Sequence, residues 1–228
     1  MQIGNGSPAR PGNGFSVRDC ALITLATGER AHSLKELREG LLRVPVGSLY
    51  HHFWGRLLRP QFDEPEYNND FASWAWRGLH DRPLAERLSM VIPTDFDDLE
   101  GVRQEVLEIV HQRLDESELA LWSAVDQGFY FLHGQVVVFS AGLVFDHPAD
   151  IVSYLPSLST GSVFFHFIDA RRRTPQRNDD FSAWLAGFDG EFAPLIADLA
   201  GLDPYFSSLK ELRHRVSAIF QRHFAGSA

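Results

Sequence analysis

Cysteine is almost absent from this sequence, in which Cys20 is the single one among 228 residues. A lone cysteine excludes an internal disulfide, and its apolar surroundings favour a small buried side chain over a nucleophile. The first fourteen residues also lack the apolar segment of a secretory signal peptide. From these absences we expect a cytoplasmic protein.

Long apolar runs and an excess of basic residues are lacking as well. No apolar run approaches the roughly 20 residues that a membrane-spanning helix requires, so we expect a soluble protein without a membrane partner. The formal net charge is −9, whereas surfaces that bind nucleic acid or anionic lipid need clustered lysine and arginine. We therefore expect no nucleic-acid partner, and a protein or a small molecule fits the composition better.

Established catalytic and metal-binding signatures are also missing. The sequence contains no HExxH, CxxC, GxSxG or Walker phosphate-binding loop. The glycine-rich segment near the start has neither a strand before it nor a helix after it, so we interpret residues 1–14 as a disordered tail. No motif indicates a cofactor or a metal, and we predict neither.

What the sequence does contain is an internal similarity at a shift of 110 to 114 residues. GSLYHHF at Gly47–Phe53 matches GSVFFHF at Gly161–Phe167. NNDFASW at Asn68–Trp74 matches NDDFSAW at Asn178–Trp184. Because histidine, tryptophan and paired aromatics are uncommon, matches at these residues indicate a repeated unit.

A second identity has another explanation. The hexapeptide SLKELR occurs at residues 33–38 and again at residues 208–213, but a shift of 175 residues matches almost nothing else. Each copy has a serine followed three residues later by a glutamate, which is the pattern of a capping box at a helix N-terminus. We therefore predict that a helix starts at each copy.

The repeat defines the domain organisation. We predict repeats at residues 15–114 and 129–224, joined by a packed connector at residues 115–128. Each repeat starts with an apolar, β-prone segment and continues with four helical patterns. Because an isolated hairpin is marginal in water, the repeats are expected to share one small sheet. The predicted fold is α+β, mostly α, with two tandem β-plus-four-helix repeats related by pseudo-twofold symmetry in one compact unit.

The spacing of the repeated residues resembles a known family. A serine, an apolar residue and an aromatic precede His-Phe, an arginine follows seven residues after the histidine, and Asn-Asp-Phe with a tryptophan precedes a leucine-rich L-x-x-L-R helix. This pattern resembles the uncharacterised prokaryotic family catalogued as domain of unknown function 5752, over about residues 15–224. HFIDARRR in the second repeat matches it more closely than the first repeat does. The resemblance implies a shape and a duplication, and it implies no activity.

Polar residues at equivalent places in the two repeats are the candidates for a site. They are His52, Arg59 and Asp70 in the first repeat and His166, Arg173 and Asp180 in the second. As a site, imidazole and carboxylate would bind a metal or act as acid and base, and guanidinium would hold an anion. As structure, each aspartate would be a helix N-cap and each histidine would tie its helix to that cap. We favour structure, because an element kept in both repeats is most simply part of what makes each fold.

We therefore expect a non-catalytic module that binds a protein partner or a small anionic ligand, with these six residues as the candidate ligand-binding residues. The alternative is a metal-dependent or acid–base enzyme with a histidine and aspartate site between the two repeats. His51 and His52 are not expected to hold one ion together, since neighbouring side chains on a helix point about 100° apart. The sequence defines neither the ligand nor the oligomeric state.

Overall fold

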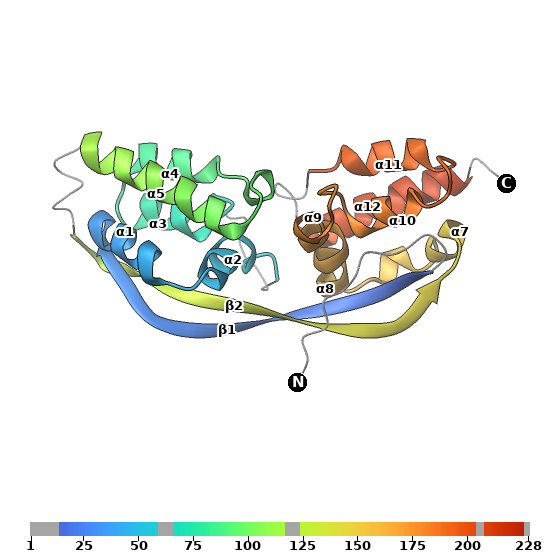
Figure 1. Cartoon of the computed structure of the whole chain (residues 1–228), viewed down its shortest axis with the longest axis horizontal. Coiled ribbons are helices and arrows are strands. Elements are labelled where there is room, and N and C mark those ends of the chain that lie inside the picture. Colours follow the sequence, from blue (N-terminus) through green and yellow to red (C-terminus); the bar gives the residue numbers. More distant parts are fainter. Residues whose placement is uncertain (1–13, 59–65, 117–123, 204–207, 226–228) are drawn as a thin grey trace. The chain divides into compact units, whose positions relative to one another are not determined.

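The structure is a computed structural model that describes residues 14–58, 66–116, 124–203 and 208–225 (Figure 1). Over these residues the protein is α+β and mostly helical, with one small antiparallel sheet, which confirms the predicted fold class. None of the described helices has both the length and the apolar composition needed to cross a membrane. Residues 1–13 of the predicted tail and residues 117–123 of the predicted connector lie outside the described residues, and the rest of the connector belongs to the ends of a helix and a strand.

Two long strands form the sheet. β1 (Phe15–Ser33) pairs with β2 (Ala124–Phe145). The contacts divide the chain into two compact units, one of residues 22–136 and one of residues 1–21 with residues 137–228. These are named below the 22–136 unit and the 137–228 unit. The unit boundaries fall within the strands, so each unit contains a segment of both strands.

In the 22–136 unit, helices lie over one face of the strand segments (Figure 1). The described helical elements are α1 (Leu34–Arg43), α2 (Gly47–Trp54), α3 (Asp70–Arg77), α4 (Arg82–Ser89), the 3-10 turn η1 (Pro93–Asp95) and α5 (Leu99–Glu116). α2 is buried along almost its whole length, its polar residues Ser48, His51 and His52 included, as expected of a helix enclosed by the strands and other helices.

In the 137–228 unit, the helical elements are shorter before the last helix. They are α7 (Pro148–Ile151), the 3-10 turn η2 (Leu155–Ser157), α8 (Thr160–Val163), the π-helical η3 (Phe164–Asp169), α9 (Ala170–Arg173), α10 (Asp180–Leu185), α11 (Ala193–Ala200) and α12 (Leu209–Ala225). α8, η3 and α9 follow one another without a break. The wider π turn in the middle of this run carries the buried His166.

The two SLKELR copies start helices, as predicted. The backbone N–H of Glu36 donates to Ser33 Oγ at 3.2 Å, and the N–H of His32 donates to the Glu36 carboxylate at 2.6 Å. In the second copy, the N–H of Glu211 donates to Ser208 Oγ at 3.2 Å. Serine caps of this kind bind backbone N–H groups that have no partner within the helix.

Buried aromatics of each strand pack around a histidine. In the 22–136 unit, the Phe129 ring lies 4.6 Å from the ring of His52 and 5.1 Å from that of Phe71, centroid to centroid. In the 137–228 unit, Phe15 lies 4.8 Å from His166 and stacks on a phenylalanine of α10. Burial of a phenylalanine side chain contributes about 1.5–3 kcal/mol, so these contacts hold strand and helices together.

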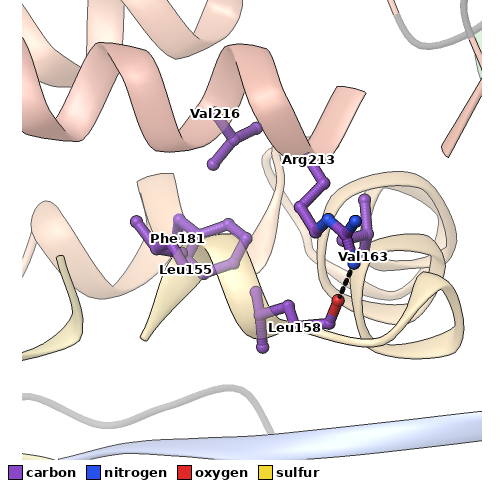
Figure 2. Close-up of a pocket in the computed structure, with 6 residues that line it drawn as sticks. All are labelled: Leu155, Leu158, Val163, Phe181, Arg213 and Val216. Atoms are coloured by element: carbon purple, nitrogen blue, oxygen red, sulfur yellow. Dashed lines mark hydrogen bonds between the residues drawn. The ribbon is translucent and has the colours of Figure 1, made fainter. Parts of the chain in front are cut away.

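One arginine of the last helix in each unit caps a preceding backbone segment. Arg103 on α5 is 7% exposed, and its Nη1 donates to the carbonyl oxygens of Leu41 and Val44, the latter at 2.9 Å. Arg213 on α12 donates from Nη1 to the Leu158 carbonyl at 2.7 Å (Figure 2). These guanidinium groups bind carbonyl groups that would otherwise lie buried without a partner.

The role of Arg103 leads to a stability prediction. Arg103→Met keeps an apolar stem but leaves the two carbonyl groups without a donor, so the free energy of unfolding should fall by about 2–4 kcal/mol in urea denaturation. Arg82→Met is the matched control, because Arg82 is exposed and its ion pair among the described residues is with Glu86, one turn along α4. The control should leave the free energy of unfolding nearly unchanged, because exposed ion pairs contribute little to stability. Equal effects of the two substitutions would contradict the assignment.

Candidate functional site

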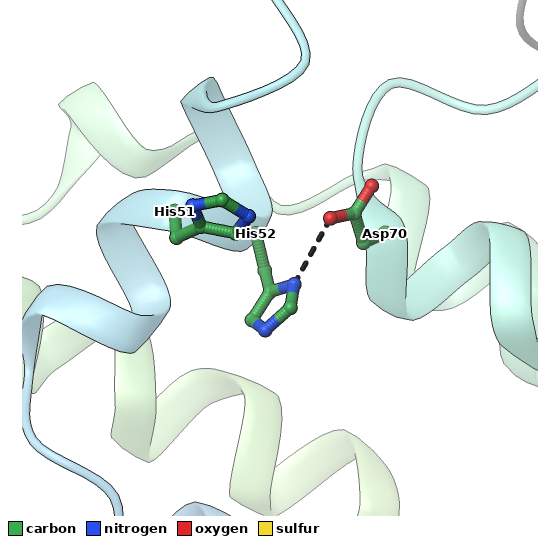
Figure 3. A group of neighbouring side chains, drawn as sticks. All are labelled: His51, His52 and Asp70. Carbon is green, nitrogen blue, oxygen red and sulfur yellow. Dashed lines mark hydrogen bonds and ion pairs between the residues drawn. The ribbon is translucent and has the colours of Figure 1, made fainter. Parts of the chain in front are cut away.

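His52 is buried and uses both ring nitrogens. Its side chain is 2% exposed, and Nδ1 lies 2.9 Å from Asp70 Oδ2 (Figure 3). Nε2 accepts the backbone N–H of Leu132 in β2 at 3.1 Å. Because an N–H group can only donate, Nε2 is the acceptor and the ring proton lies on Nδ1, which donates to Asp70. Below, this arrangement is the His52 cluster.

His166 makes the corresponding contacts in the 137–228 unit. Nδ1 lies 2.8 Å from Asp180 Oδ2, and Nε2 accepts the backbone N–H of Arg18 in β1 at 2.8 Å. The same reasoning places the ring proton on Nδ1. In this His166 cluster, as in the His52 cluster, the imidazole joins a strand amide to the aspartate at the start of the next helix. His52 therefore contacts Asp70, and His166 contacts Asp180, each pair within one predicted repeat.

An arginine completes the His166 cluster. Arg173 donates from Nη2 to Asp180 Oδ2 at 3.0 Å and from Nε to Asp169 Oδ2 at 2.8 Å. Its guanidinium carbon also lies 4.0 Å from the centre of the Phe165 ring, within the range of a cation–π contact. The predicted Arg173 therefore adjoins the predicted Asp180, and two carboxylates balance its charge.

The arginine beside the His52 cluster is one that the sequence analysis missed. Arg59 lies outside the described residues. Arg56 instead approaches the cluster, with Nε 3.8 Å from Asp70 Oδ1 and Nη1 donating to Ser73 Oγ at 2.9 Å. The spacing contained a signal, because Arg56 follows His52 by four residues, about one helical turn. The prediction relied on alignment with the second repeat, where the helical run is longer.

The prediction that Asp70 and Asp180 are N-caps is wrong by one residue. Asn69 caps α3 by accepting the N–H of Ala72 at 2.9 Å, and Asp179 caps α10 by accepting the N–H of Ser182 at 2.8 Å. An N-cap needs extended backbone so that its side chain reaches the first helical turn, and Asn69 has it, with φ −140° and ψ 161°. The following aspartate is the first helical residue, and its carboxylate is therefore available to the histidine.

Small residues allow the helices to approach the strands closely. Ser162 Oγ donates to the Arg18 carbonyl at 2.6 Å, so both backbone groups of Arg18 are bound by the helical run. A Cβ on Gly161 would lie 2.3 Å from the Cys20 carbonyl oxygen, so only glycine fits there. Burial raises the pKa of the Cys20 thiol to about 12. The thiol therefore stays protonated, as expected of a structural cysteine.

One group of side chains has the composition of a metal site. His51, His52 and Asp70 offer ligand atoms that all lie within 4.8 Å of one another (Figure 3). The two histidines thus come closer than predicted, although their ring planes are 84° apart. For His52 to bind an ion through Nδ1, that nitrogen would have to lose the proton that it shares with Asp70. In the sequence match of Gly47–Phe53 with Gly161–Phe167, Phe165 takes the place of His51.

The chain belongs to a family of proteins without an assigned activity. A family model described as "Family of unknown function (DUF5752)" matches residues 12–221, which confirms the resemblance. Among solved structures, the chain is similar to that of OrfY from Thermoproteus tenax. The TM-score is 0.78 at 27% sequence identity, over 96% of this chain and 99% of that chain. A comparison with curated proteins found no match.

The His52 cluster predicts a local stability effect. His52→Ala would leave the Leu132 N–H without an acceptor and Asp70 without its donor, so the free energy of unfolding should fall by about 2–5 kcal/mol. Hydrogen exchange at the Leu132 amide should become faster. His111→Ala is the control, since His111 is exposed on α5, and it should have little effect. Unchanged exchange at Leu132 in His52→Ala would show that the hydrogen bond is unimportant.

The buried carboxyl of Asp179 should make the stability of the protein depend on pH. Burial raises the pKa of its carboxyl above the ordinary 3.8, and hydrogen bonds from Ser182 partly oppose that shift. Its ionised form therefore lowers stability at neutral pH, and this penalty disappears as the pH falls through the raised pKa to below 3.8.

Asn69 at the equivalent position shows that a neutral cap suffices. Asp179→Asn should therefore be as stable as the unmodified protein, or more stable, at pH 7, with any gain shrinking toward pH 3.5 in thermal unfolding. A variant that is less stable at pH 7 would mean that the cap requires the charge.

Proposed function

We propose that this protein is a non-catalytic cytoplasmic module that binds a protein partner or a small anionic ligand, and that its two histidine clusters are structural. The supporting observation is that both nitrogens of each imidazole are already bonded, one to a carboxylate and one to a strand amide. A general base needs a free acceptor nitrogen within reach of its substrate. In these clusters that nitrogen accepts a backbone N–H.

We propose that Arg173, the arginine of the His166 cluster, is also structural. An anion reaching Arg173 would have to compete with Asp169 and Asp180, which lie 2.8 and 3.0 Å from its nitrogens. A carboxylate pair at this distance neutralises a guanidinium that is partly removed from water. The charge of the clusters is therefore balanced within the protein, which favours a structural role over anion capture there.

We also propose that the chain is an internal duplication with pseudo-twofold symmetry. Contacts at corresponding places support it: Arg18 and Leu132, 114 positions apart, donate to the two cluster histidines. Gly28 and Gly142, also 114 apart, are strand residues with φ of 83° and 74°, values that favour glycine. A structural element repeated in this way needs no catalytic explanation.

A metal-dependent enzyme remains the second candidate, because His51, His52 and Asp70 could hold an ion together. Imidazole and carboxylate suit Zn²⁺ and other first-row divalent ions. In this candidate, His52 Nδ1 would have to lose the proton that it donates to Asp70 before it could bind the ion. The candidate also requires His51, for which the second repeat has no histidine equivalent.

Metal titration separates the two candidates. We expect the purified protein to contain no stoichiometric metal, and its melting temperature to be the same with EDTA and with equimolar Zn²⁺, since an ion that binds only the folded state would raise it. His51→Phe, which introduces the residue found in the second repeat, should behave identically, as should the control His111→Ala. Stoichiometric metal that is lost in His51→Phe and kept in His111→Ala would favour the enzyme.

A further inference from the structure

A pocket of about 410 Å³ lies along α12 in the 137–228 unit. This volume falls within the range of about 300–1,000 Å³ that small-molecule sites occupy. Polar and basic side chains dominate its lining, which includes Pro156, Lys210, Arg213, His214, Ser217 and Gln221. The α12 members are three or four residues apart, so they share one face of the helix.

Positive charge on this face is not balanced within the described part of the protein. Lys210 and His214 are exposed, and neither takes part in an ion pair among the described residues. The acidic residue of α12, Glu211, points to another face, where it pairs with Arg215 at 3.0 Å. The pocket therefore presents cationic groups in a chain whose formal net charge is −9.

Arg213 lies between this pocket and a group of apolar side chains, and it lines both. Its Nη1 is fixed on the Leu158 carbonyl, and its stem packs on an apolar group (Figure 2). That group consists of Leu155, Leu158, Val163, Phe181 and Val216. These apolar side chains leave no space for water around the arginine stem. The N–H groups of the guanidinium that do not bind Leu158 are therefore further donors at the pocket.

Ser217 adds a buried hydroxyl without a partner. The residue is 5% exposed, and its Oγ has no hydrogen bond to any described residue. Buried polar groups are almost always hydrogen-bonded, and an exception calls for an explanation such as a ligand. Ser217 lines the pocket, so a bound oxyanion would supply the missing acceptor after a small movement of the side chains.

A comparison of α12 with the matching positions of α5 shows which pocket residues also occur in the other unit. In the sequence repeat, Arg103 corresponds to Arg213, and both bind carbonyl oxygens of their own unit. Lys210, His214 and Ser217 instead correspond to a glutamate, a glutamine and a leucine. The charged pocket is therefore not part of what both repeats share, and the fold does not require it.

We propose that the α12 pocket binds the phosphate group of a small phosphorylated molecule. The inference rests on the proposed binding function and places its anionic ligand outside the histidine clusters. Lys210 would supply a charged donor, and His214, Ser217 and Gln221 would supply further N–H and O–H donors. Several donors converging without an acidic side chain suit a doubly charged phosphate with three terminal oxygens better than a carboxylate with two.

Calorimetric titration of the whole protein with inorganic phosphate and pyrophosphate tests this site, with citrate as the carboxylate probe. Lys210→Gln should raise the Kd for phosphate at least about tenfold. Lys35→Gln is the matched control, because Lys35 is the other lysine of the chain, stands at the same place in SLKELR and is exposed on α1. It should leave the Kd unchanged.

Ser217→Ala keeps the test independent of folding. It should raise the Kd for phosphate severalfold while the melting temperature stays equal or increases, because an unsatisfied buried hydroxyl is removed. The inference would be overturned by a Kd that rises equally in Lys210→Gln and Lys35→Gln, by tighter binding of citrate than of phosphate, or by absence of phosphate binding.

With two lysines in the chain, competitive acetylation followed by mass spectrometry gives a second readout. Phosphate should protect Lys210 and leave Lys35 reactive, whereas equal protection would indicate a general salt effect and contradict the site. Failure here is distinguishable from failure of the proposed function, which the metal titration detects through His51, a residue of the other unit.

Discussion

The hydrogen bond from a strand amide to a buried imidazole is the constraint on which the rest of the structure depends. It joins Arg18 to His166 and Leu132 to His52, groups 148 and 80 residues apart in the sequence. By occupying Nε2 it also places the ring proton on Nδ1, which then donates to the aspartate of the next helix. One bond thus fixes the position of a strand, the tautomer of a histidine and the start of a helix.

At the starts of α3 and α10, two adjacent polar residues have the two roles that were predicted for one aspartate: capping the helix and binding the histidine. The first, Asn69 or Asp179, has extended backbone and caps the helix. The second is already helical and lies near the N-terminal N–H groups, where a negative charge is favourable. Its carboxylate can therefore accept from the histidine while the cap remains satisfied. These two roles explain why two polar residues, Asn69 and Asp70 or Asp179 and Asp180, directly precede the phenylalanine in the two matching segments.

Local features were predictable from the sequence, and long-range backbone partners were not. The serine caps at Ser33 and Ser208 and the contact of each histidine with its aspartate depend on side chains whose spacing is visible in the sequence. The partners of Nε2 are main-chain N–H groups, which every residue except proline carries, so no residue type marks Leu132 or Arg18 as the donor. The α12 pocket was missed for a related reason: its basic side chains look like a solvated helix face until a neighbouring turn and an unpaired hydroxyl are placed beside them.

The division of the strands has a consequence for the order of folding during synthesis. Residues 22–136 are contiguous, so the 22–136 unit can assemble as soon as β2 has been made. The 137–228 unit contains residues 15–21 of β1, and the acceptor for Arg18 is made 148 residues later. Among the described residues, the strand segment that is synthesised first therefore obtains its helices last. Phe15 and Val17, which are buried in the folded protein, therefore lack the helices that cover them until residues 137–228 have been synthesised.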